Sequence, residues 1–490
     1  MSLSTSLANA LSGLRVNSRL TAAASNNLAN ALTPGYGRQT LEVGSLSLAG
    51  EGAGVRVISA NRAASPGLTA ARRNADGEAA LLAPQSEALS RLGSVLGEPT
   101  DIDGLFRRLE TFETTLRQFA ETPESQPRQI QVVNDARDLT GILNQISSEV
   151  ATLRQSADFD IATDVATVNR NLYSIQELNQ RIQLLSSADQ NFAILVDQRE
   201  RLIDEVSAIV PVQIQNNSND VIHLYTKEGV FLLQETVSEL TFTRSPIITA
   251  AMTYDPLGGG ALSGLTVGGL DISPGVGRES IQAGSLAGNF AVRDQIATEF
   301  QSRLDQFAGD LIGRFQDPAV DPTLTATDPG LFTDAGAIFD PTIIEGLSGR
   351  ISVNALVDPS QGGQTSLLRD GLNAVAPGPE TSDAIARQLV DALTQGRPAS
   401  VIPGLSGNFS SSEMVSGIVE LTGIARFNAD NNTASAQGTR QSLATAEAEE
   451  IGVDTDLELQ QLILIEQAYS ANIQIIQATS RMLQEITEIA

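Results

Sequence analysis

Cysteine and tryptophan are absent from the 490-residue sequence, and histidine and lysine each occur once. Without cysteine, the chain has no disulfides, no thiolate metal sites and no cysteine nucleophile. The single histidine, His223, lies in the alternating segment VIHLYTKEGVFLLQ, where a half-exposed strand residue is the expected interpretation. A catalytic triad would also need an acid and a nucleophile close to that histidine, and no nearby pattern supplies them.

Aromatic side chains are scarce as well, at 4% of residues, although hydrophobic residues make up 41%. We therefore expect a core of leucine, isoleucine, valine and alanine, in about two to four domains of roughly 100–200 residues each. Acidic residues outnumber basic ones by 58 to 31, which gives a net charge of −27. Such a charge opposes binding to nucleic acid and to anionic membranes, so neither is expected as a partner.

Long hydrophobic runs are missing too. No stretch reaches the ~18 apolar residues of a membrane-spanning helix, so no membrane insertion is expected. The opening segment, MSLSTSLANALSGLRVNSRL, has neither the basic start nor the uninterrupted apolar segment of a secretory signal. The chain is therefore expected to stay in the cytoplasm or to leave by a route that does not cleave its N-terminus.

Motifs that bind phosphate or metal are weak throughout. The glycine-rich segments AGEGAG (Ala49–Gly54) and PLGGGALSG (Pro256–Gly264) lack the Lys-Ser/Thr pair and the strand–turn–helix context of a phosphate loop, so turns and strand ends are expected there. One loop carries several acids that miss the spacing and the closing glutamate of an EF-hand: Asp317, Asp321, Asp328 and Asp334. The sequence therefore predicts no cofactor, no metal and no enzymatic activity.

Both ends of the chain have the apolar spacing of long amphipathic helices. In the first, expected from Leu3 to about Leu32, the seam of a coiled coil recurs in steps of three and four, at Leu3, Leu7, Ala10, Leu14, Asn17, Thr21, Ala24 and Leu28. A second seam follows Leu457, at Gln461, Leu464, Ala468, Ala471, Ile475, Ala478, Met482, Glu485 and Ile489, widened by Leu462, Ile465, Tyr469, Ile476, Leu483 and Ile486. Because a free helix cannot leave that much apolar surface in water, we expect the two terminal helices to pair.

Between these ends the chain alternates between helical blocks and β-like segments. Helical apolar spacing is found at about 84–97, 103–121, 128–157, 162–187, 191–210, 286–316, 382–393 and 410–450. After Pro211 the pattern changes to strand-like alternation with Asn-, Asp- and Gly-rich turns, which predicts hairpins, and a further strand is expected near Arg350–Val357.

The expected fold class is α+β and multidomain. It comprises paired N- and C-terminal coiled-coil helices, a helical rod domain and inserted, mainly β modules. We divide the chain into four parts. The terminal assembly domain comprises residues 1–45 and 452–490, and the rod domain comprises residues 46–210, 285–316 and 380–451. The first inserted β module is residues 211–284, and the second inserted loop and β module is residues 317–379.

The two ends also resemble a known family. SNNLANALTPGYGRQ (Ser25–Gln39) is similar to the N-terminal signature of bacterial flagellar rod, hook and hook-associated proteins, and its Gly-Tyr-x-Arg-Gln ending looks like the FlgK-type branch. GVDTDLELQQLILIEQAYSANIQIIQATSRML (Gly452–Leu483), with Glu466–Tyr469 at its centre, resembles the matching C-terminal end. Internal segments resemble the FlgK-type branch as well, at Phe119–Leu139, Glu177–Ile182, Val196–Ser207 and Ala291–Ala308.

The resemblance implies a structural protein of the hook–filament junction, exported through the flagellar type III channel and located outside the cell in the flagellum. The partners it implies are copies of itself in a ring, a hook protein, a second hook–filament junction protein and an export chaperone on the C-terminal helix. One alternative is a hook or distal rod protein of the same axial family, which the helical block 84–210 and the Tyr36–Gln39 ending disfavour. Another is a flagellum-exported enzyme or surface-binding protein whose β modules carry a site.

Three asparagines, Asn26, Asn27 and Asn30, lie in the expected N-terminal helix, although asparagine disfavours helix interiors. Our hypothesis is that they set the register between subunits, because a buried unpaired amide costs roughly 1–3 kcal/mol and so penalises wrong registers. The predicted assembly site comprises Leu3, Leu7, Leu14, Asn26, Asn27, Leu28, Asn30, Thr33, Pro34, Gly35, Tyr36, Leu464, Gln467, Ala468, Tyr469, Ile475, Ile476, Met482 and Leu483.

The terminal helices are also expected to be mobile before assembly. An isolated pair of helices is only marginally stable in water. We therefore expect weak amide-exchange protection over about residues 1–35 and 455–490 in the free protein.

Overall fold

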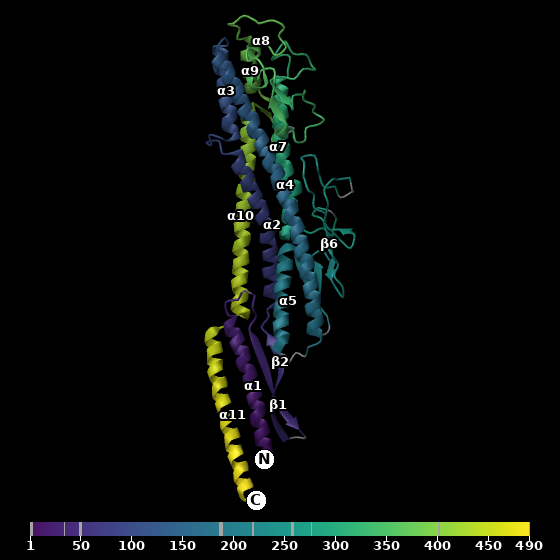
Figure 1. Ribbon diagram of the computed structural model, residues 1–490, viewed down its shortest axis with the longest axis vertical. Helices are drawn as coiled ribbons and strands as arrows, with labels where there is room; N and C mark the ends of the chain where they lie inside the picture. The colour runs from purple at the N-terminus through teal and green to yellow at the C-terminus, as the bar shows by residue number, and fades with distance from the viewer. Residues whose placement is uncertain are drawn as a thin grey trace.

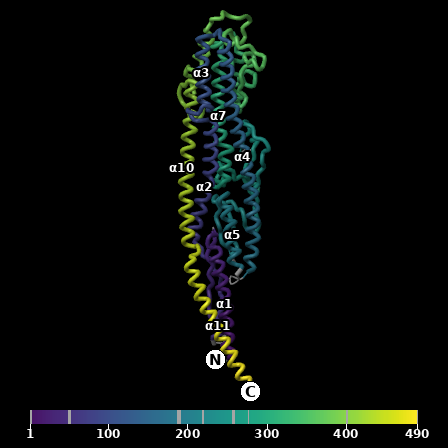
Figure 2. Tube along the Cα trace, turned by 60° about the vertical axis from the view of Figure 1, so that its left-hand side comes forward, coloured from purple at the N-terminus to yellow at the C-terminus, as the bar shows by residue number. Residues whose placement is uncertain are grey.

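The computed structural model describes residues 3–33, 35–48, 51–185, 190–217, 220–255, 259–275, 277–399 and 402–489. The molecule is long and narrow, and both termini lie at the same end (Figure 1). A second view shows the same slender outline, with helices running along most of its length (Figure 2). Pro34 and the starts of the glycine-rich segments at Ala49 and Pro256 lie outside the described residues.

The terminal helices pair, as predicted. Helix α1 (Leu3–Ala29) and helix α11 (Thr455–Ile489) lie side by side and run in opposite directions (Figure 1). On its other side, α1 packs against an antiparallel hairpin of strands β1 (Gln39–Leu48) and β2 (Glu51–Arg62). The hairpin therefore packs with the terminal helices, and the part of the chain that packs there continues as far as Arg62.

The rod is a bundle of long helices, and the predicted helical blocks are present in it. Its members are α2 (Pro66–Leu96), α3 (Leu105–Glu121), α4 (Gln126–Gln183), α5 (Gln190–Ile209), α6 (Gly284–Ala291), α7 (Ala297–Phe315), α9 (Ala384–Thr394) and α10 (Ser411–Ile451). Helix α10 begins with a capping box, in which the Ser410 side chain and Glu413 bond each other's backbone N–H groups. It then packs along α2, so segments more than 300 residues apart in sequence lie together.

Helix α4 corrects one prediction. The sequence indicated two helices, at 128–157 and 162–187, but the chain forms one unbroken helix of 58 residues, about 87 Å long at 1.5 Å per residue. The polar segment near residue 158 looked like a break. It stays helical because Ala157 and Ile161 continue the buried stripe, while buried Asp158 accepts hydrogen bonds from Arg293 (2.8 Å) and from the backbone N–H of Ser245 (2.8 Å).

Arg293 fixes the inserted β segment to α4. It lies in a π-helical turn, Val292–Ile296, and its fully buried guanidinium lies over the rings of Phe242 (5.6 Å) and Phe290 (4.9 Å). Burial alone would lower its pKa, but hydrogen bonds and charge from Asp294 and Asp158 raise the pKa above its ordinary value. The arginine therefore remains charged and holds the two elements together.

The β structure expected after Pro211 is present as two small antiparallel sheets. One sheet has β3 (Val212–Asn216), β4 (Ile222–Thr226) and β5 (Phe231–Leu233), and the other has β6 (Leu240–Thr241), β7 (Thr266–Val267) and β8 (Leu270–Asp271). Their apolar side chains share one core with α4, α5 and α6, in which Leu224 and Leu265 pack with Val168 and Leu172. The described residues of this segment therefore pack on the rod and share its core.

The segment 317–379 is likewise part of the rod's far end. It contains β9 (Phe332–Asp334), β10 (Ile351–Val353), the 3₁₀ turns η3 (Leu347–Gly349) and η4 (Pro359–Gln361), and α8 (Leu367–Asp370), and the short strands β11 (Arg397–Pro398) and β12 (Asn408–Phe409) follow α9. Phe332 packs edge-on against Phe112 of α3 and Phe315 of α7. The loop-rich segment is therefore anchored by the same aromatic cluster that joins the helices.

Candidate assembly site at the terminal helices

The segment that follows α1 is held by the side chain of Asn27. Asn27 is 1% exposed; its Nδ2 donates to the backbone oxygen of Gln39 (2.8 Å), and its Oδ1 accepts from the N–H of Gln39 (2.8 Å) and the hydroxyl of Tyr36 (2.9 Å). One amide therefore ties the end of the helix to the first residue of β1. Gly35 allows the intervening turn because its φ of 73° is left-handed, a conformation that favours glycine.

Tyr36 is buried in this turn. Burial, followed by the negative charges of Asp197 and Glu458, raises its pKa to about 12. Its hydroxyl therefore stays protonated at neutral pH and keeps donating to Asn27. The tyrosine is a structural part of the turn in this chain.

The same turn is bonded to the rod through Asp197 of α5. Asp197 Oδ1 accepts from the N–H of Gly37 (3.3 Å) and from Nε of Arg62 (3.1 Å), and Arg62 Nη2 donates to the backbone oxygen of Gly35 (2.9 Å). Arg62 ends β2, so one arginine connects the hairpin, the turn and the rod. A side chain at Gly37 would collide with Arg62, at 2.6 Å from its Nε.

Arg38 makes the link to the C-terminal helices. Its Nε donates to Oε1 of Glu458 (2.7 Å), a residue of α11 that is 1% exposed, and its backbone N–H donates to the oxygen of Ile451 (2.9 Å) at the end of α10. The segment Tyr36–Gln39 therefore touches α1, β2, α5, α10 and α11. The residues that follow the N-terminal helix form the joint between the terminal end and the rod.

The other two asparagines have different surroundings. Asn30 is half-buried and closes the helix end locally, because its Nδ2 donates to the backbone oxygen of Asn26 (2.9 Å) and its Oδ1 accepts from Thr33 (3.3 Å). Asn26 is exposed, and its side chain makes no hydrogen bond among the described residues. The amide of Asn27 is buried and bonds within its own chain, and that of Asn30 also bonds locally, so Asn26 is the exposed asparagine that can meet a second copy.

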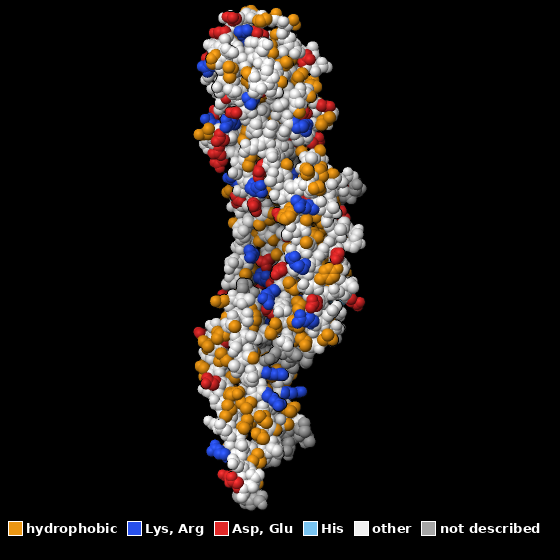
Figure 3. Space-filling model, viewed as in Figure 1, with side chains coloured by type: hydrophobic (Ala, Val, Ile, Leu, Met, Phe, Trp, Pro, Cys, Tyr) orange, Lys and Arg blue, Asp and Glu red, His pale blue; other side chains and the backbone are white. Residues whose placement is uncertain are grey.

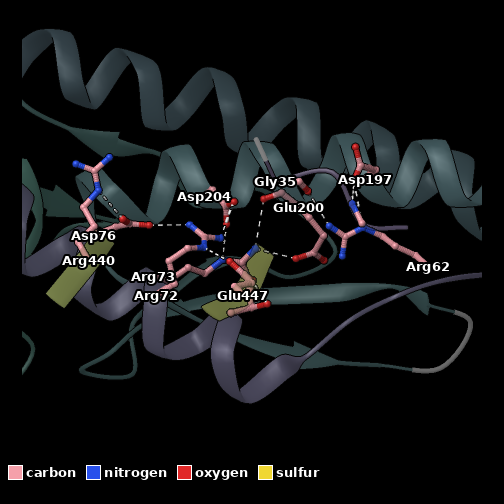
Figure 4. A network of polar contacts seen from close by, with 12 residues as sticks. Gly35, Arg62, Arg72, Arg73, Asp76, Asp197, Glu200, Asp204, Arg440 and Glu447 are labelled. Atoms are coloured by element: carbon pink, nitrogen blue, oxygen red, sulfur yellow. Dashed lines mark hydrogen bonds and ion pairs between the residues drawn. The ribbon is translucent and has the colours of Figure 1, made fainter. Parts of the chain in front are cut away.

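An ionic network lies next to this joint (Figure 4). Arg72 of α2 contacts Asp76 (2.7 Å), Asp204 of α5 (2.7 Å) and Glu447 of α10. Its neighbour Arg73 contacts Asp204 and Glu200, at 2.6 and 2.8 Å, and Arg440 of α10 pairs with Asp76 at 3.0 Å.

This network fixes α2, α5 and α10 at the base of the rod. Burial acts to lower the pKa of Arg72, but the charges and hydrogen bonds of Asp204 and Glu447 raise the pKa above its ordinary value. Each of the three guanidinium nitrogens of Arg72 meets a different carboxylate. Arginine suits this position because its planar fork presents several donors at once.

The seam between α1 and α11 corrects a second prediction. On α11, buried and half-buried residues form the line Glu458, Leu462, Ile465, Asn472, Ile476 and Thr479, and Asn472 of this line lies against Gly13 of α1. The predicted seam is instead mostly exposed, at Gln461, Leu464, Ala468, Ala471, Ile475, Met482 and Glu485. The two lines share the same three–four period. The inner line contains the polar residues Glu458, Asn472 and Thr479, so its apolar pattern is weaker in the sequence.

The two helices are in close contact at Gly13 of α1. A side-chain carbon at this position would lie 2.7 Å from Nδ2 of Asn472, so a larger residue would displace the Asn472 side chain. Ala10 and Ala24 are also buried along α1, whereas Leu3, Leu7 and Leu14 are half-buried. The contact depends on small residues more than on the leucines that the sequence analysis chose.

The outer surface of the pair is markedly apolar (Figure 3). Of the predicted assembly residues on α11, Leu464 is 64% exposed, Met482 52% and Ile475 46%. Exposed side chains also include Leu28, Gln467, Ala468, Tyr469 and Leu483, while Ile476 is half-buried, as are Asn30 and Thr33. Apolar patches of this kind mark interaction sites on soluble proteins.

A groove of about 790 Å³ runs between the helices on this surface. Ser18, Thr21 and Ala22 of α1 line one side, and Leu459, Leu462, Ile463, Glu466 and Tyr469 of α11 line the other. Within the described residues, there is no cluster of three or more histidines and acids that could hold a metal, and no helix is long and apolar enough to cross a membrane. The arrangement suits helix packing, not chemistry.

Sequence reasoning missed several residues of the joint. Asp197 and Glu458 contact the turn from positions 160 and 420 residues further along the chain. The segment around Asp197 carried a signal, because it belongs to one of the internal stretches with family resemblance. Gly13 carried none, since a single glycine in a helix has no distinctive pattern.

Two protein-family models match the chain. The model described as "Flagellar hook-associated protein FlgK helical domain" matches residues 89–317, and that described as "Flagellar basal body rod FlgEFG protein C-terminal" matches residues 448–489. The first covers most of α3 to α7, and the second covers the end of α10 and α11.

Individual relatives agree with these matches. Flagellar hook-associated protein 1 of Bacillus subtilis is 26% identical over 221 residues, 43% of this chain and 43% of that protein. The proteins of the same name from Salmonella typhimurium and Escherichia coli are 24% and 25% identical, over 62% of this chain and 55% of their own length. The chain thus spans about half the length of these relatives. The hook junction protein FlgK of Burkholderia pseudomallei aligns with a TM-score of 0.45 and 21% identity, over 56% of this chain and 47% of that one.

Proposed function

We propose that the chain is a FlgK-type flagellar hook-associated protein, a structural protein that links the flagellar hook to the filament. Residues 89–317 match the helical domain of FlgK, and residues 448–489 match the C-terminal end of the related rod proteins. The family is structural, which agrees with the prediction of a non-enzymatic role. The match of residues 89–317 to a helical domain of hook-associated proteins favours the junction over a hook or distal rod protein.

The observation that carries the proposal is the exposed apolar face of the terminal pair. Helix α11 uses one line of residues against α1 and leaves a second line, with Leu464, Ile475 and Met482, in solvent. Burial of this apolar surface between copies would stabilise their contact by about 25 cal/mol per Å² of surface removed from water. The terminal helices are therefore surfaces for assembly, and copies of the chain pack side by side through them in a ring.

The remaining partners follow from this position. A hook protein lies on one side of the ring and a second junction protein on the other, and an export chaperone covers the C-terminal helix before assembly. The protein then leaves through the flagellar type III channel and acts outside the cell, in the flagellum. Exposed Asn26 contributes to the register between copies, whereas Asn27 holds each copy's own joint.

A deletion strain tests the proposal. Removing the gene should leave hooks without filaments while filament subunits accumulate in the medium, and the full-length chain should restore both filaments and swimming. A chain without residues 1–33 and 456–490 should be produced but should not restore them. Normal filaments in the deletion strain, or restoration by the truncated chain, would contradict the proposal.

A further inference from the structure

The two terminal helices carry opposite charges on their exposed surfaces. Arg15 and Arg19 are exposed on α1, and the first 41 residues contain no aspartate or glutamate. Glu466 is exposed on α11. Among the described residues, none of these three side chains forms an ion pair, although most other arginines of the chain do.

Arg19 and Glu466 lie at the same height along the pair. The helices are antiparallel and meet at Gly13 and Asn472. Arg19 lies six residues after Gly13, and Glu466 lies six residues before Asn472. At 1.5 Å per residue, both charges are therefore about 9 Å above the contact, and Arg15 lies about one turn below Arg19.

The groove separates the two charges. Ser18 and Ala22 line its α1 side, and Arg15 and Arg19 lie on the same exposed face of α1, three residues before them. Glu466 lines the α11 side, next to Ile463. The groove thus has a basic edge and an acidic edge at one level, with apolar and small side chains between them.

We propose that a second copy of this chain docks sideways at this groove, with its Glu466 against Arg15 and Arg19 of the first. The inference rests on the proposed function. Such a contact joins two different edges, so it is heterologous and continues from copy to copy, either closing into a ring or rising as a helix. No axial shift is needed, because the paired charges already lie at the same height.

A two-fold arrangement would also bring Arg19 near Glu466, but with the copies pointing in opposite directions. Molecules that bridge a hook and a filament share one direction along the flagellum, which favours the sideways arrangement. The two geometries differ in a testable way. A sideways contact links many copies in a chain, whereas a two-fold contact links only two.

Disulfide trapping tests the geometry, because the chain has no cysteine of its own. Full-length Arg19→Cys and Glu466→Cys variants are co-expressed in the deletion strain, and isolated flagella are oxidised. We expect a covalent dimer from this mixture and a ladder of multimers from the double variant. The matched control is Arg56→Cys, an exposed arginine of β2, mixed with Glu466→Cys, which should give no dimer. A missing dimer in the first mixture, or a double variant that stops at dimers, would overturn the proposal.

Charge reversal tests the energetics. Arg19→Glu and Glu466→Arg should each lower the fraction of flagellated cells at least about threefold, since an opposite-charge pair becomes a like-charge pair in every contact. The combined variant should recover most of that loss, and Arg56→Glu should behave like the wild type. Secretion into the medium confirms that each variant folds and is exported. No recovery in the combined variant would refute the pairing, whereas failure of the wild-type chain to restore filaments would refute the proposed function instead.

Discussion

Replacing Asn27 with alanine should open the joint between the terminal helices and the rod. The change removes three hydrogen bonds and leaves three buried groups without partners: the N–H and the carbonyl oxygen of Gln39, and the hydroxyl of Tyr36. Each buried unsatisfied group costs about 1–3 kcal/mol, but partial access of water to the loosened turn reduces the sum. We expect a local loss of about 3 kcal/mol.

Amide hydrogen exchange measures this loss directly. The N–H of Gln39 donates to Asn27 in the native joint, so its exchange reports the opening of that contact. A loss of about 3 kcal/mol corresponds to exchange about a hundredfold faster. Amides in the middle of α4 should be unaffected, because they lie in other cores.

Asn26→Ala is the matched control. Asn26 precedes Asn27 on the same helix, but its side chain is exposed and makes no hydrogen bond among the described residues. Its replacement should change the exchange of Gln39 by less than about threefold. If Asn27→Ala leaves the Gln39 amide as protected as the wild type, Asn27 does not hold the joint and the reasoning fails.

Three further predictions concern the same end of the molecule. Gly13→Val should separate α1 from α11, which limited proteolysis would show as faster cleavage of both helices. Adding Asn472→Ala to this variant should partly restore protection, because it makes room for the valine. Equal cleavage of the single and double variants would be inconsistent with the close contact. Because the pKa of Tyr36 is about 12 in the folded chain, against 10.0 ordinarily, its stabilising contribution is complete below pH 10 and is lost as pH rises from 10 to 12. Tyr36→Phe should accordingly remove one late-titrating phenol from an absorbance titration, and an unchanged titration would show that Tyr36 ionises normally. Arg72→Lys should lower the urea midpoint, with a cost of about 2–3 kcal/mol, because an ammonium cannot meet three carboxylates at once, whereas an unchanged midpoint would mean that the network is dispensable.

The pairing of the terminal helices could be predicted because apolar periodicity reports a buried face directly. The line of contact on α11 was predicted only in part. Leu462, Ile465 and Ile476 were expected to flank the seam, whereas the polar residues of the inner line were not, since two neighbouring lines satisfy the same period. In the inner line, Glu458 pairs with Arg38, and the side chain of Asn472 lies in the space left by Gly13. Contacts of this kind depend on residues hundreds of positions away, so no local pattern reveals them.

The joint shows the same limit. The sequence marked Asn27 as unusual for a helix interior and assigned it to contacts between copies. The structure places its partner, Gln39, only twelve residues further along the same chain. A buried asparagine that bonds one backbone N–H and one carbonyl substitutes for a strand neighbour, and that role becomes visible only when the turn has been folded. The predicted break within α4 has a similar origin, because the partner of Asp158, Arg293, lies 135 residues further along the chain.

The unbroken α4 helix has a mechanical consequence. Its first half lies in the core at the far end of the rod, and its second half lies in the core shared with the β sheets and then in the small cluster around Ile182. Neither half can rotate without dragging the other, because no hinge divides them. A rotation of the middle of the rod is therefore coupled to a rotation of its far end through one continuous helix.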